Sequence, residues 1–497
     1  MRDSSMKRII CLILAILSSL YVLTACKDSD SPVGTSDVGA IGDVSDTSTS
    51  LEEKLEVPEQ ANYNGETFNI LTAGNVAYED FKFDEESSMA LENAQYKRKA
   101  LIEQNYNVDI VQTVKKAYSS GGGPGYTQIS TDCNAGDCNF DLALIAGYDV
   151  SVLAYSNFLY DLNSIPGIDL TKSWWDQKAN ENLSVNGVMF FTTGEITVSD
   201  NNTAFVILFN KDLHESYSLE DPYQLVYDGK WTLDKFAELC KTVTEDLNQD
   251  GVMNQNDRFG VMVWDDSVMG IVNAAGQQCC TIADDGTIEL TIYNETTIAA
   301  LEKYFDIAFD TQYAITYQRV TKDPISMWQN DQGLFWMTTM GNIPSLREME
   351  SDFGVLPYPK LTEEQDSYYT TIAPYNSQFI CVPLIQNDLE RTGVITEALA
   401  YYGKTIVTPA YYDINLIGQS TRDEESSDML DIIFDSLVFD IGYYYQIGPY
   451  NKQLILMVRE HNRNFTSMYD TYKNSAQNLL KVINQYYQVA VSEWVEQ

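Results

Sequence analysis

The residues from Asp246 to Asp257 have the types and the spacing of a calcium-binding loop. The segment reads D-L-N-Q-D-G-V-M-N-Q-N-D and matches the pattern D-x-[DN]-x-[DN]-G at the start of an EF-hand loop. Calcium takes roughly six to eight oxygen ligands, and glycine at the sixth position allows the sharp turn that brings them together. We therefore predict a Ca²⁺ site with ligands from positions 1, 3, 5, 7, 9 and 12, namely Asp246, Asn248, Asp250, Val252 through its carbonyl group, Asn254 and Asp257.

Two features distinguish this loop from that of a calcium sensor. Position 12 is Asp257, whereas an EF-hand has glutamate there, so the carboxylate has a shorter reach. The residues that follow, 258–263, read R-F-G-V-M-V and are typical of a strand, where an EF-hand would begin its second helix. We expect a structural calcium site, and the alternative is a turn rich in Asp and Asn that binds no ion.

The charge balance limits the partners of this chain. It has 31 basic and 72 acidic residues. Residues 1–25 hold three basic residues and one acidic residue, so the rest of the chain has a net charge of −43. Such a surface repels nucleic acids, and we expect no nucleic-acid partner. The two histidines, His214 and His461, are too few for a typical zinc site or for histidine-based catalysis.

Cysteines follow no metal-binding spacing. Apart from Cys11 and Cys26, the chain has Cys133, Cys138, Cys240, Cys279, Cys280 and Cys381. Outside the cell such residues can form disulfides, and a bridge between Cys133 and Cys138 is the most plausible local one. The remaining connectivity stays open.

The N-terminus has the features of a secretion signal. Lys7 and Arg8 precede an apolar run over residues 9–23, which is too short for a membrane-spanning helix. Residues 23–26 read L-T-A-C and resemble the bacterial lipobox, in which the cysteine receives a diacylglycerol group and becomes the first mature residue. This resemblance implies a signal peptide over residues 1–25 and lipidation of Cys26. The alternative is an ordinary signal peptide that is cleaved elsewhere.

Residues 26–57 are predicted to form a tether behind that anchor. They are rich in Ser, Thr, Asp and Gly and have few large apolar side chains, so they cannot bury enough surface to offset the entropy of ordering. A flexible coil of this length spans about 30 Å. No later run approaches the length of a transmembrane helix. We expect the protein at the cell membrane, lipid-anchored on the extracellular face.

The globular part begins with a strand–helix–strand pattern. A strand over 67–71, a helix over about 88–104 and a strand over 108–111 form the repeating unit of a parallel sheet. Residues 141–145 (D-L-A-L-I) then have the apolar run of a strand that is buried on both faces. Ligands of open α/β sheets bind just beyond such strand ends, so Tyr148 is a candidate ligand contact. The alternative is that Tyr148 only begins the next helix.

Four segments carry recognisable motifs. Residues 202–213 (N-T-A-F-V-I-L-F-N-K-D-L) are a long apolar strand with a polar end, and residues 227–236 contain G-K-W-T-L-D-K-F, in which Thr232 suits a helix N-cap. Residues 353–360 read F-G-V-L-P-Y-P-K, and residues 422–430 begin R-D-E-E-S. In type and order these segments resemble bacterial extracellular solute-binding proteins of ABC importers, in particular the sugar-binding branch of Gram-positive gut bacteria.

The resemblance implies an α/β fold of the periplasmic-binding-protein type. Two lobes would be joined by hinge crossings, and the C-terminal third would be rich in helices. The first lobe would comprise residues 58–204 and 341–372, the second lobe residues 205–340 and 373–497, and the hinge segments would lie near 204–209, 333–340 and 373–377.

A sugar site needs aromatic faces beside amides and acids, because sugars combine apolar CH faces with many hydroxyl groups. Residues of these types occur near the implied crossings. We predict ligand contacts from Trp264, Trp336, Asp200, Tyr375 and Asn376, in addition to Tyr148. Trp336 lies between Phe335 and Met337, so a place in the core is the alternative for this residue.

The functional hypothesis is a receptor without catalytic activity. It would capture a sugar, most plausibly an oligosaccharide, outside the cell as a monomer and deliver it to the transmembrane subunits of an ABC permease. A surface glycan-degrading enzyme and a non-transporting glycan-binding adhesin or sensor are the alternatives. An enzyme of the first kind would need two carboxylates on either side of a sugar subsite, and no hydrolase motif is present.

Overall fold

The computed structural model describes residues 53–412 and 424–495. The predicted signal peptide, Cys26 and the part of the predicted tether up to residue 52 lie outside the described residues. Within the described part, no helix is long and apolar enough to cross a membrane.

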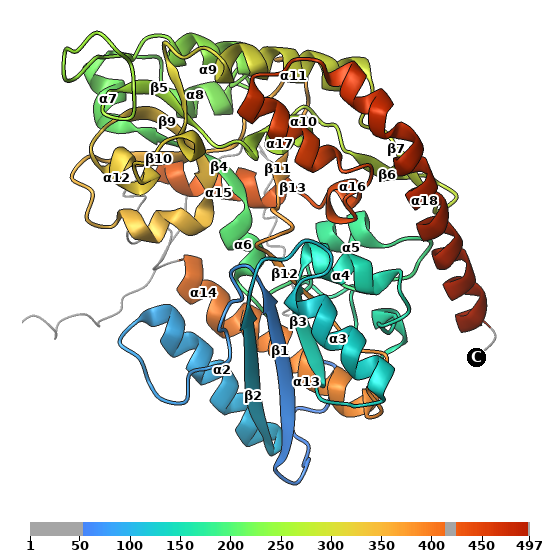
Figure 1. Ribbon diagram of the computed structural model, residues 1–497. Helices are drawn as coiled ribbons and strands as arrows, with labels where there is room; N and C mark the ends of the chain where they lie inside the picture. Colours follow the sequence, from blue (N-terminus) through green and yellow to red (C-terminus); the bar gives the residue numbers. More distant parts are fainter. Residues whose placement is uncertain (1–52, 413–423, 496–497) are drawn as a thin grey trace, which may run out of the picture. The chain divides into compact units, whose positions relative to one another are not determined.

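The first sheet follows the predicted strand–helix–strand pattern. Its order is β12-β3-β1-β2, and β1 pairs in parallel with both β2 and β3, whereas β12 is antiparallel to β3. Helices α2 and α3 lie on opposite sides of this sheet (Figure 1). All five residues of β3 are buried, as its continuous apolar run predicts. The elements are β1 (Glu66–Gly74), α2 (Ala90–Tyr106), β2 (Val108–Lys116), α3 (Pro124–Ala135), β3 (Leu142–Ala146), α4 (Gly147–Ala154) and β12 (Gln378–Cys381).

The second sheet has five strands in the order β10-β4-β9-β5-β8. Strand β5 is parallel to β8 and β9, and β4 is antiparallel to β9 and β10. All six residues of β4 are buried, which explains the long apolar run in the sequence. The strands are β4 (Phe205–Asn210), β5 (Phe259–Val263), β8 (Ala314–Thr316), β9 (Gly333–Thr339) and β10 (Phe353–Leu356).

The remaining helices surround the sheets and dominate the chain after residue 389 (Figure 1). In chain order they are α5 (Gln177–Leu183), α6 (Ser199–Thr203), α7 (Lys211–Ser216), α8 (Pro222–Tyr227), α9 (Leu233–Cys240), α10 (Ser267–Ala274), α11 (Glu295–Ala308), α12 (Pro324–Gln329), α13 (Leu389–Tyr402), α14 (Thr408–Ala410), α15 (Glu424–Asp435), α16 (Ile441–Tyr444), α17 (Tyr450–Glu460) and α18 (Phe465–Val495). Short elements complete the fold: β6 (Cys280–Ile282), β7 (Ile288–Leu290), β11 (Thr370–Thr371), β13 (Leu437–Val438), η1 (Leu162–Ser164), η2 (Tyr317–Arg319), η3 (Met340–Leu346) and η4 (Gly403–Val407).

Two of the sequence motifs meet in the core of the second sheet. Trp231 is fully buried, and its Nε1 donates a hydrogen bond of 2.9 Å to the carbonyl oxygen of Pro357. The backbone N–H of Lys360 donates to the carbonyl of Trp231 over 3.0 Å. Thr232 caps α9 by accepting a hydrogen bond from the backbone N–H of Lys235, as predicted. The motifs G-K-W-T and L-P-Y-P-K are therefore parts of one packed unit.

The expected assignment of the later segments to lobes needs two corrections. Strand β10 pairs with β4, so residues 353–356 belong to the second sheet rather than to the first lobe. Strand β12 pairs with β3, so residues 378–381 belong to the first sheet rather than to the second lobe. Helix α13 also packs against α2, beside the first sheet. Strands of four buried residues carry no local signal for the sheet edge that they join.

The cysteines of the described chain are all free thiols. Cys133 is half-buried near the end of α3, and Cys138 is exposed. The expected bridge between these two residues is not formed.

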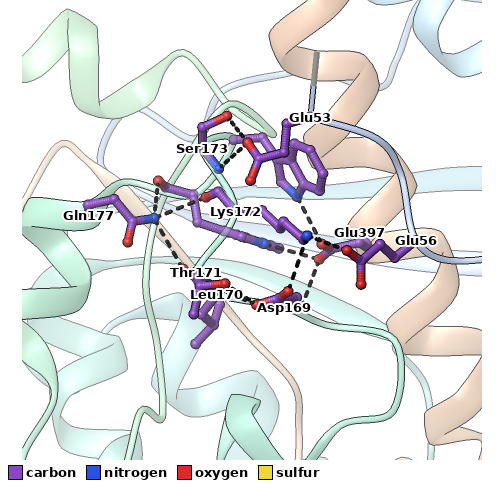
Figure 2. Close-up of polar contacts among 11 residues, drawn as sticks. Glu53, Glu56, Asp169, Leu170, Thr171, Lys172, Ser173, Gln177 and Glu397 are labelled. Carbon is purple, nitrogen blue, oxygen red and sulfur yellow. Dashed lines mark hydrogen bonds and ion pairs between the residues drawn. The ribbon is translucent and has the colours of Figure 1, made fainter. Parts of the chain in front are cut away.

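The first described residues are held on the loop that contains Lys172 and Ser173 (Figure 2). The Glu53 carboxylate accepts hydrogen bonds from both the backbone N–H and the hydroxyl group of Ser173. Lys172 forms an ion pair of 2.5 Å with Glu56. Lys404 donates a hydrogen bond of 3.0 Å to the carbonyl of Ser173 from the other side. The chain is therefore attached to this loop from residue 53 onward.

Candidate ligand-binding site

Tyr148 begins the group of side chains that we consider the candidate site. It follows the end of β3, where α4 starts. Gly147 lets another segment approach this strand end, because a Cβ atom there would lie 2.7 Å from the carbonyl oxygen of Pro374. The approach places Tyr375 beside Tyr148, with ring centroids 6.4 Å apart and planes 25° from parallel. The structure thus brings together two residues that the sequence predicts as ligand contacts.

Two C-terminal helices complete the surroundings of Tyr148. Its hydroxyl accepts a hydrogen bond of 2.8 Å from Nδ2 of Asn451, on α17. Tyr443, on α16, packs edge to face against its ring at 6.1 Å. Burial raises the pKa of Tyr148, so this phenol remains protonated at neutral pH. Tyr148 is 6% exposed, so a ligand reaches only a small part of this neutral ring.

Asn376, also predicted, links the same segment to the end of β1. Its Oδ1 accepts a hydrogen bond of 2.9 Å from Nδ2 of Asn75. Asn75 is exposed and Asn376 is half-buried. The free donors and acceptors of these two amides are accessible to a ligand.

Two acidic residues, Asp265 and Asp266, follow the end of β5. Asp265 is completely buried, and it forms an ion pair with Nε of Arg459. Asp266 is half-buried, and its pKa is raised well above the usual range by burial and by the neighbouring carboxylate of Asp265. The raised pKa favours a neutral carboxyl group, which can both donate and accept a hydrogen bond.

Asp266 is an electrostatic neighbour of three tyrosines. Burial is the main cause of the raised pKa values of Tyr148, Tyr375 and Tyr443, and Asp266, once it is ionised at high pH, adds to each of them. Asp266 therefore interacts with residues of α4, of α16 and of the segment before β12. We name these four residues together with Asn376 the Tyr148 group.

Tyr118 adds an exposed aromatic ring to this region. It lies two residues beyond β2, and 69% of its surface is exposed. The loop after it reaches Tyr148, because a Cβ atom on Gly121 would lie 3.6 Å from the carbonyl oxygen of Tyr148. Residues from the ends of β1, β2, β3 and β5 therefore converge, as expected where ligands bind to α/β sheets.

The two predicted tryptophans lie in the core. Trp336 is 1% exposed in the central strand β9, where its ring packs against Trp328 at 5.7 Å and Tyr317 at 6.3 Å. Trp264 is 8% exposed and packs against Phe205 at 4.8 Å. Trp336 is therefore a core residue, which is the alternative given for it above, because both faces of β9 are covered. Trp264 is two positions before Asp266 in the sequence, with Asp265 between them.

Asp200 faces a different cavity. It is 5% exposed, and its carboxylate accepts hydrogen bonds from Oγ1 of Thr193 over 2.9 Å and from the backbone N–H of Asn201 over 2.8 Å. With Asp176 and Glu195 it lines a cavity of 390 Å³. Burial raises the pKa of Asp200 well above its usual range, and Asp176 adds to the shift. The structure does not place Asp200 in the Tyr148 group.

The first half of the predicted calcium loop has the turn geometry that its motif requires. The Asp246 carboxylate accepts hydrogen bonds from the backbone N–H groups of Asp250 (3.3 Å) and Gly251 (2.7 Å). Asn248 Oδ1 accepts from the N–H of Asp250, and Asp250 Oδ1 accepts from the N–H of Val252. Gly251 has a φ of +80°, which favours glycine. The side chains at positions 1, 3 and 5 thus lie on one turn.

The second half of the loop fits a calcium ion less well. Asp257 is completely buried, and its two oxygens accept hydrogen bonds from the N–H groups of Leu247 (3.1 Å) and Asn254 (2.8 Å). The carbonyl of Val252 accepts from Nδ2 of Asn254. Over residues 53–412 and 424–495, no group of three or more His, Cys, Asp or Glu side chains is arranged to hold a metal ion. The calcium site stays a prediction.

Several members of the site were not predicted as ligand contacts. Asp266 has a sequence signal, because it follows the end of β5 just as Tyr148 follows β3. Tyr118 lies in the same way beyond β2. Tyr443, Asn451 and Arg459 come from helices far along the chain, and no local pattern identifies them.

The comparison with protein families identifies the chain. Residues 92–378 match the family of bacterial extracellular solute-binding proteins, and the chain belongs to this family. The family consists of binding proteins rather than enzymes. The α/β fold and the family that the sequence motifs predict are both confirmed. The comparison with curated proteins gives no match.

Solved structures of similar fold include solute-binding proteins of ABC transporters. One, from Thermotoga lettingae and bound with alpha-D-tagatose, is 15% identical over 84% of this chain and 100% of that chain, with a TM-score of 0.54. Another, from Listeria monocytogenes in complex with cycloalternan, is 15% identical over 84% and 99%, with a TM-score of 0.54. The GacH receptor of Streptomyces glaucescens, described unliganded and with acarbose, is 12% identical over 85% and 99%, with a TM-score of 0.52. At these identities the similarity establishes the fold.

Proposed function

We propose that this protein is the receptor of an ABC importer and that it captures a carbohydrate outside the cell. The observation that carries the proposal is the Tyr148 group, in which neutral aromatic rings surround a half-buried carboxyl group. A sugar needs such rings for its CH faces and such polar groups for its hydroxyls. The tagatose, cycloalternan and acarbose in the titles of similar structures support the same ligand class.

The position of the site suggests how binding is transmitted. Asn75, Tyr118 and Tyr148 follow strands of the first sheet, whereas Asp266 follows a strand of the second. A sugar that contacts both sets favours the arrangement in which they are close, so binding stabilises the closed form. The closed form is then the species that the transmembrane permease recognises, and the receptor acts as a monomer.

We place the receptor on the extracellular face of the cell membrane, anchored through Cys26. The L-T-A-C motif at residues 23–26 and the polar composition of residues 27–52 support this assignment. Attachment of the chain from Glu53 onward limits the tether to the residues before it. Cell fractionation tests the anchor. We expect the unmodified protein in the membrane fraction and a Cys26→Ser variant in the soluble fraction. A membrane-bound Cys26→Ser variant would contradict it.

Calorimetric titration with a panel of mono- and oligosaccharides tests the receptor function. We expect one site per chain and no product after prolonged incubation with the bound sugar. Release of shorter sugars would instead indicate a glycan-degrading enzyme. Asp265 is buried in its ion pair with Arg459, so Asp265 and Asp266 do not form two accessible carboxylates on either side of a ligand. Binding without any loss of uptake in a deletion strain would indicate an adhesin or sensor.

We also propose that Asp246–Asp257 binds a structural calcium ion. Calcium at a hundredfold excess over its Kd stabilises a folded protein by about 2.7 kcal/mol, so the midpoint of thermal unfolding should rise by several degrees. Asp250→Ala should abolish this rise, and Asp284→Ala, which changes an exposed acid outside the loop, should leave it intact. Scanning calorimetry in calcium and in chelator makes the measurement. Identical unfolding curves for the unmodified protein in both buffers would rule out the site.

A further inference from the structure

A second cavity, of 520 Å³, lies beside β8, the edge strand of the second sheet. Its apolar lining includes Met253, Phe259, Ile315 and Val320. Its volume is in the range of small-molecule sites, about 300–1,000 Å³. The cavity is therefore large enough for an organic molecule with an apolar face.

The charges around this cavity are the reverse of those of the whole chain. Acidic residues outnumber basic ones 72 to 31 in the sequence. Among the described residues, however, the lining contains Arg319, Arg459 and His461 and no carboxylate. In so acidic a protein, a cavity whose only described ionisable side chains are basic is a local site of attraction for an anion.

The two arginines have unused hydrogen-bond donors. Arg319 ends η2 and is exposed, and no ion pair or hydrogen bond joins its side chain to the rest of the described chain. Arg459 uses its Nε for Asp265, and among the described residues its two Nη groups have no partner. A guanidinium group binds carboxylate or phosphate oxygens through two parallel hydrogen bonds. Two such groups border the same cavity.

His461 is positioned at the same rim by its backbone and by a ring contact. It caps the C-terminus of α17 in the left-handed conformation, with a φ of 52°. Its ring stacks on Phe309 with centroids 4.6 Å apart and planes 7° from parallel. The imidazole is therefore a fixed polar group at the cavity.

We propose that this cavity binds a small organic anion with an apolar face. The anionic group, a carboxylate or a phosphate, takes the free donors of Arg319 and Arg459. The apolar face lies against Met253, Phe259, Ile315 and Val320. The site is separate from the Tyr148 group but is linked to it, because Arg459 also holds Asp265 next to Asp266. The inference does not depend on carbohydrate binding.

Titration of the mature protein with 2-naphthoate and with 2-naphthamide tests the proposal. The two probes share the apolar ring system, and only the first carries a charge. We expect 2-naphthoate to bind at least tenfold more tightly than 2-naphthamide, because only the carboxylate can use the guanidinium donors. Inorganic phosphate, which lacks an apolar face, should bind at least tenfold more weakly than 2-naphthoate. Equal affinities within either pair would overturn the proposal.

A matched pair of variants locates the binding. Arg319→Gln should lower the affinity for 2-naphthoate at least tenfold. Arg347→Gln changes another exposed arginine, outside the cavity lining, and should leave the affinity unchanged. Full affinity in Arg319→Gln, or an equal loss in both variants, would overturn the site. The experiment uses no sugar, so its outcome is independent of the test of the receptor function.

Discussion

Asp266→Ala should lower the affinity for the carbohydrate ligand about a hundredfold. The half-buried side chain interacts with Tyr148, Tyr375 and Tyr443, which are buried or half-buried, so water replaces a lost hydrogen bond only in part. A ligand hydroxyl left without its partner at such a position costs about 1–3 kcal/mol, and each 1.4 kcal/mol corresponds to a factor of ten in Kd. Calorimetric titration with the sugar identified in the panel measures the change directly.

Asp266→Asn separates the charge of this residue from its hydrogen bonds. Burial and Asp265 raise the pKa of Asp266, so its folded form favours the neutral carboxyl group. Asparagine has the same shape and also offers one acceptor and one donor direction. We therefore expect Asp266→Asn to lose at most tenfold in affinity, much less than Asp266→Ala. An equal loss in both variants would show that the ligand needs a negative charge at this position.

The control for both variants is an exposed acid away from the site. Asp366→Ala removes one negative charge from a surface loop between β10 and β11 and should leave the affinity unchanged. If Asp266→Ala binds the sugar as tightly as Asp366→Ala does, the Tyr148 group is not the ligand site. Melting curves of the three variants establish that any loss reflects binding rather than unfolding.

The part of the site that strand ends define was predictable from the sequence. Tyr148 follows a five-residue buried run, and the rule that ligands bind beyond such strands applies to it directly. The same rule applied to β5 selects Trp264, which directly follows the strand, whereas the half-buried residue at this strand end is Asp266, two positions further on. A large aromatic residue at the end of an apolar run is more often part of the core, and Trp264 and Trp336 both lie there.

Pairings between distant segments were not predictable in the same way. The segment at residues 353–356 and the segment at 378–381 are both four-residue strands with every residue buried. Nothing in either segment specifies that the first joins β4 and the second joins β3. The residues of β10 are more than 140 positions away in sequence from their partners in β4. Those of β12 are more than 230 positions away from their partners in β3. Asn451 and Arg459 reach the site through similarly distant contacts.

Glu397 provides a pH effect on stability that a single substitution isolates. This residue of α13 is 2% exposed, and it accepts hydrogen bonds of 3.0 Å from the indole Nε1 of Trp174 and of 3.0 Å from that of Trp175. The backbone N–H of Asp169 donates a third, of 3.3 Å (Figure 2). Despite these donors, burial raises the pKa of Glu397 from 4.5 to about 7. The cost of burying the charge is therefore the larger effect.

The sign of the pH dependence follows from this shift. Below pH 4.5 the carboxyl group is protonated in both the folded and the unfolded protein, and it has no effect. Between pH 4.5 and about 7 the unfolded protein releases the proton while the folded protein keeps it, so stability falls as the pH rises. Above the pKa of the folded protein, Glu397 is charged in both states, and the full free-energy cost of burying its charge lowers the stability. A shift of this size corresponds to about 3 kcal/mol.

Glu397→Gln should remove this slope. Glutamine has no proton to release, and its single acceptor oxygen leaves one of the two indoles without a partner, at a cost of about 1–3 kcal/mol that does not depend on pH. Urea unfolding at pH 5 and pH 8 should show the unmodified protein losing about 2–3 kcal/mol more than Glu397→Gln between the two conditions. Glu348→Gln, an exposed glutamate, should keep the slope of the unmodified protein. All other carboxylates are shared, so they contribute equally to the pH dependence of stability. If Glu397→Gln keeps the pH dependence of the unmodified protein, Glu397 is ionised in the folded protein. The hydrogen bonds from the two indoles then outweigh the cost of burying its charge.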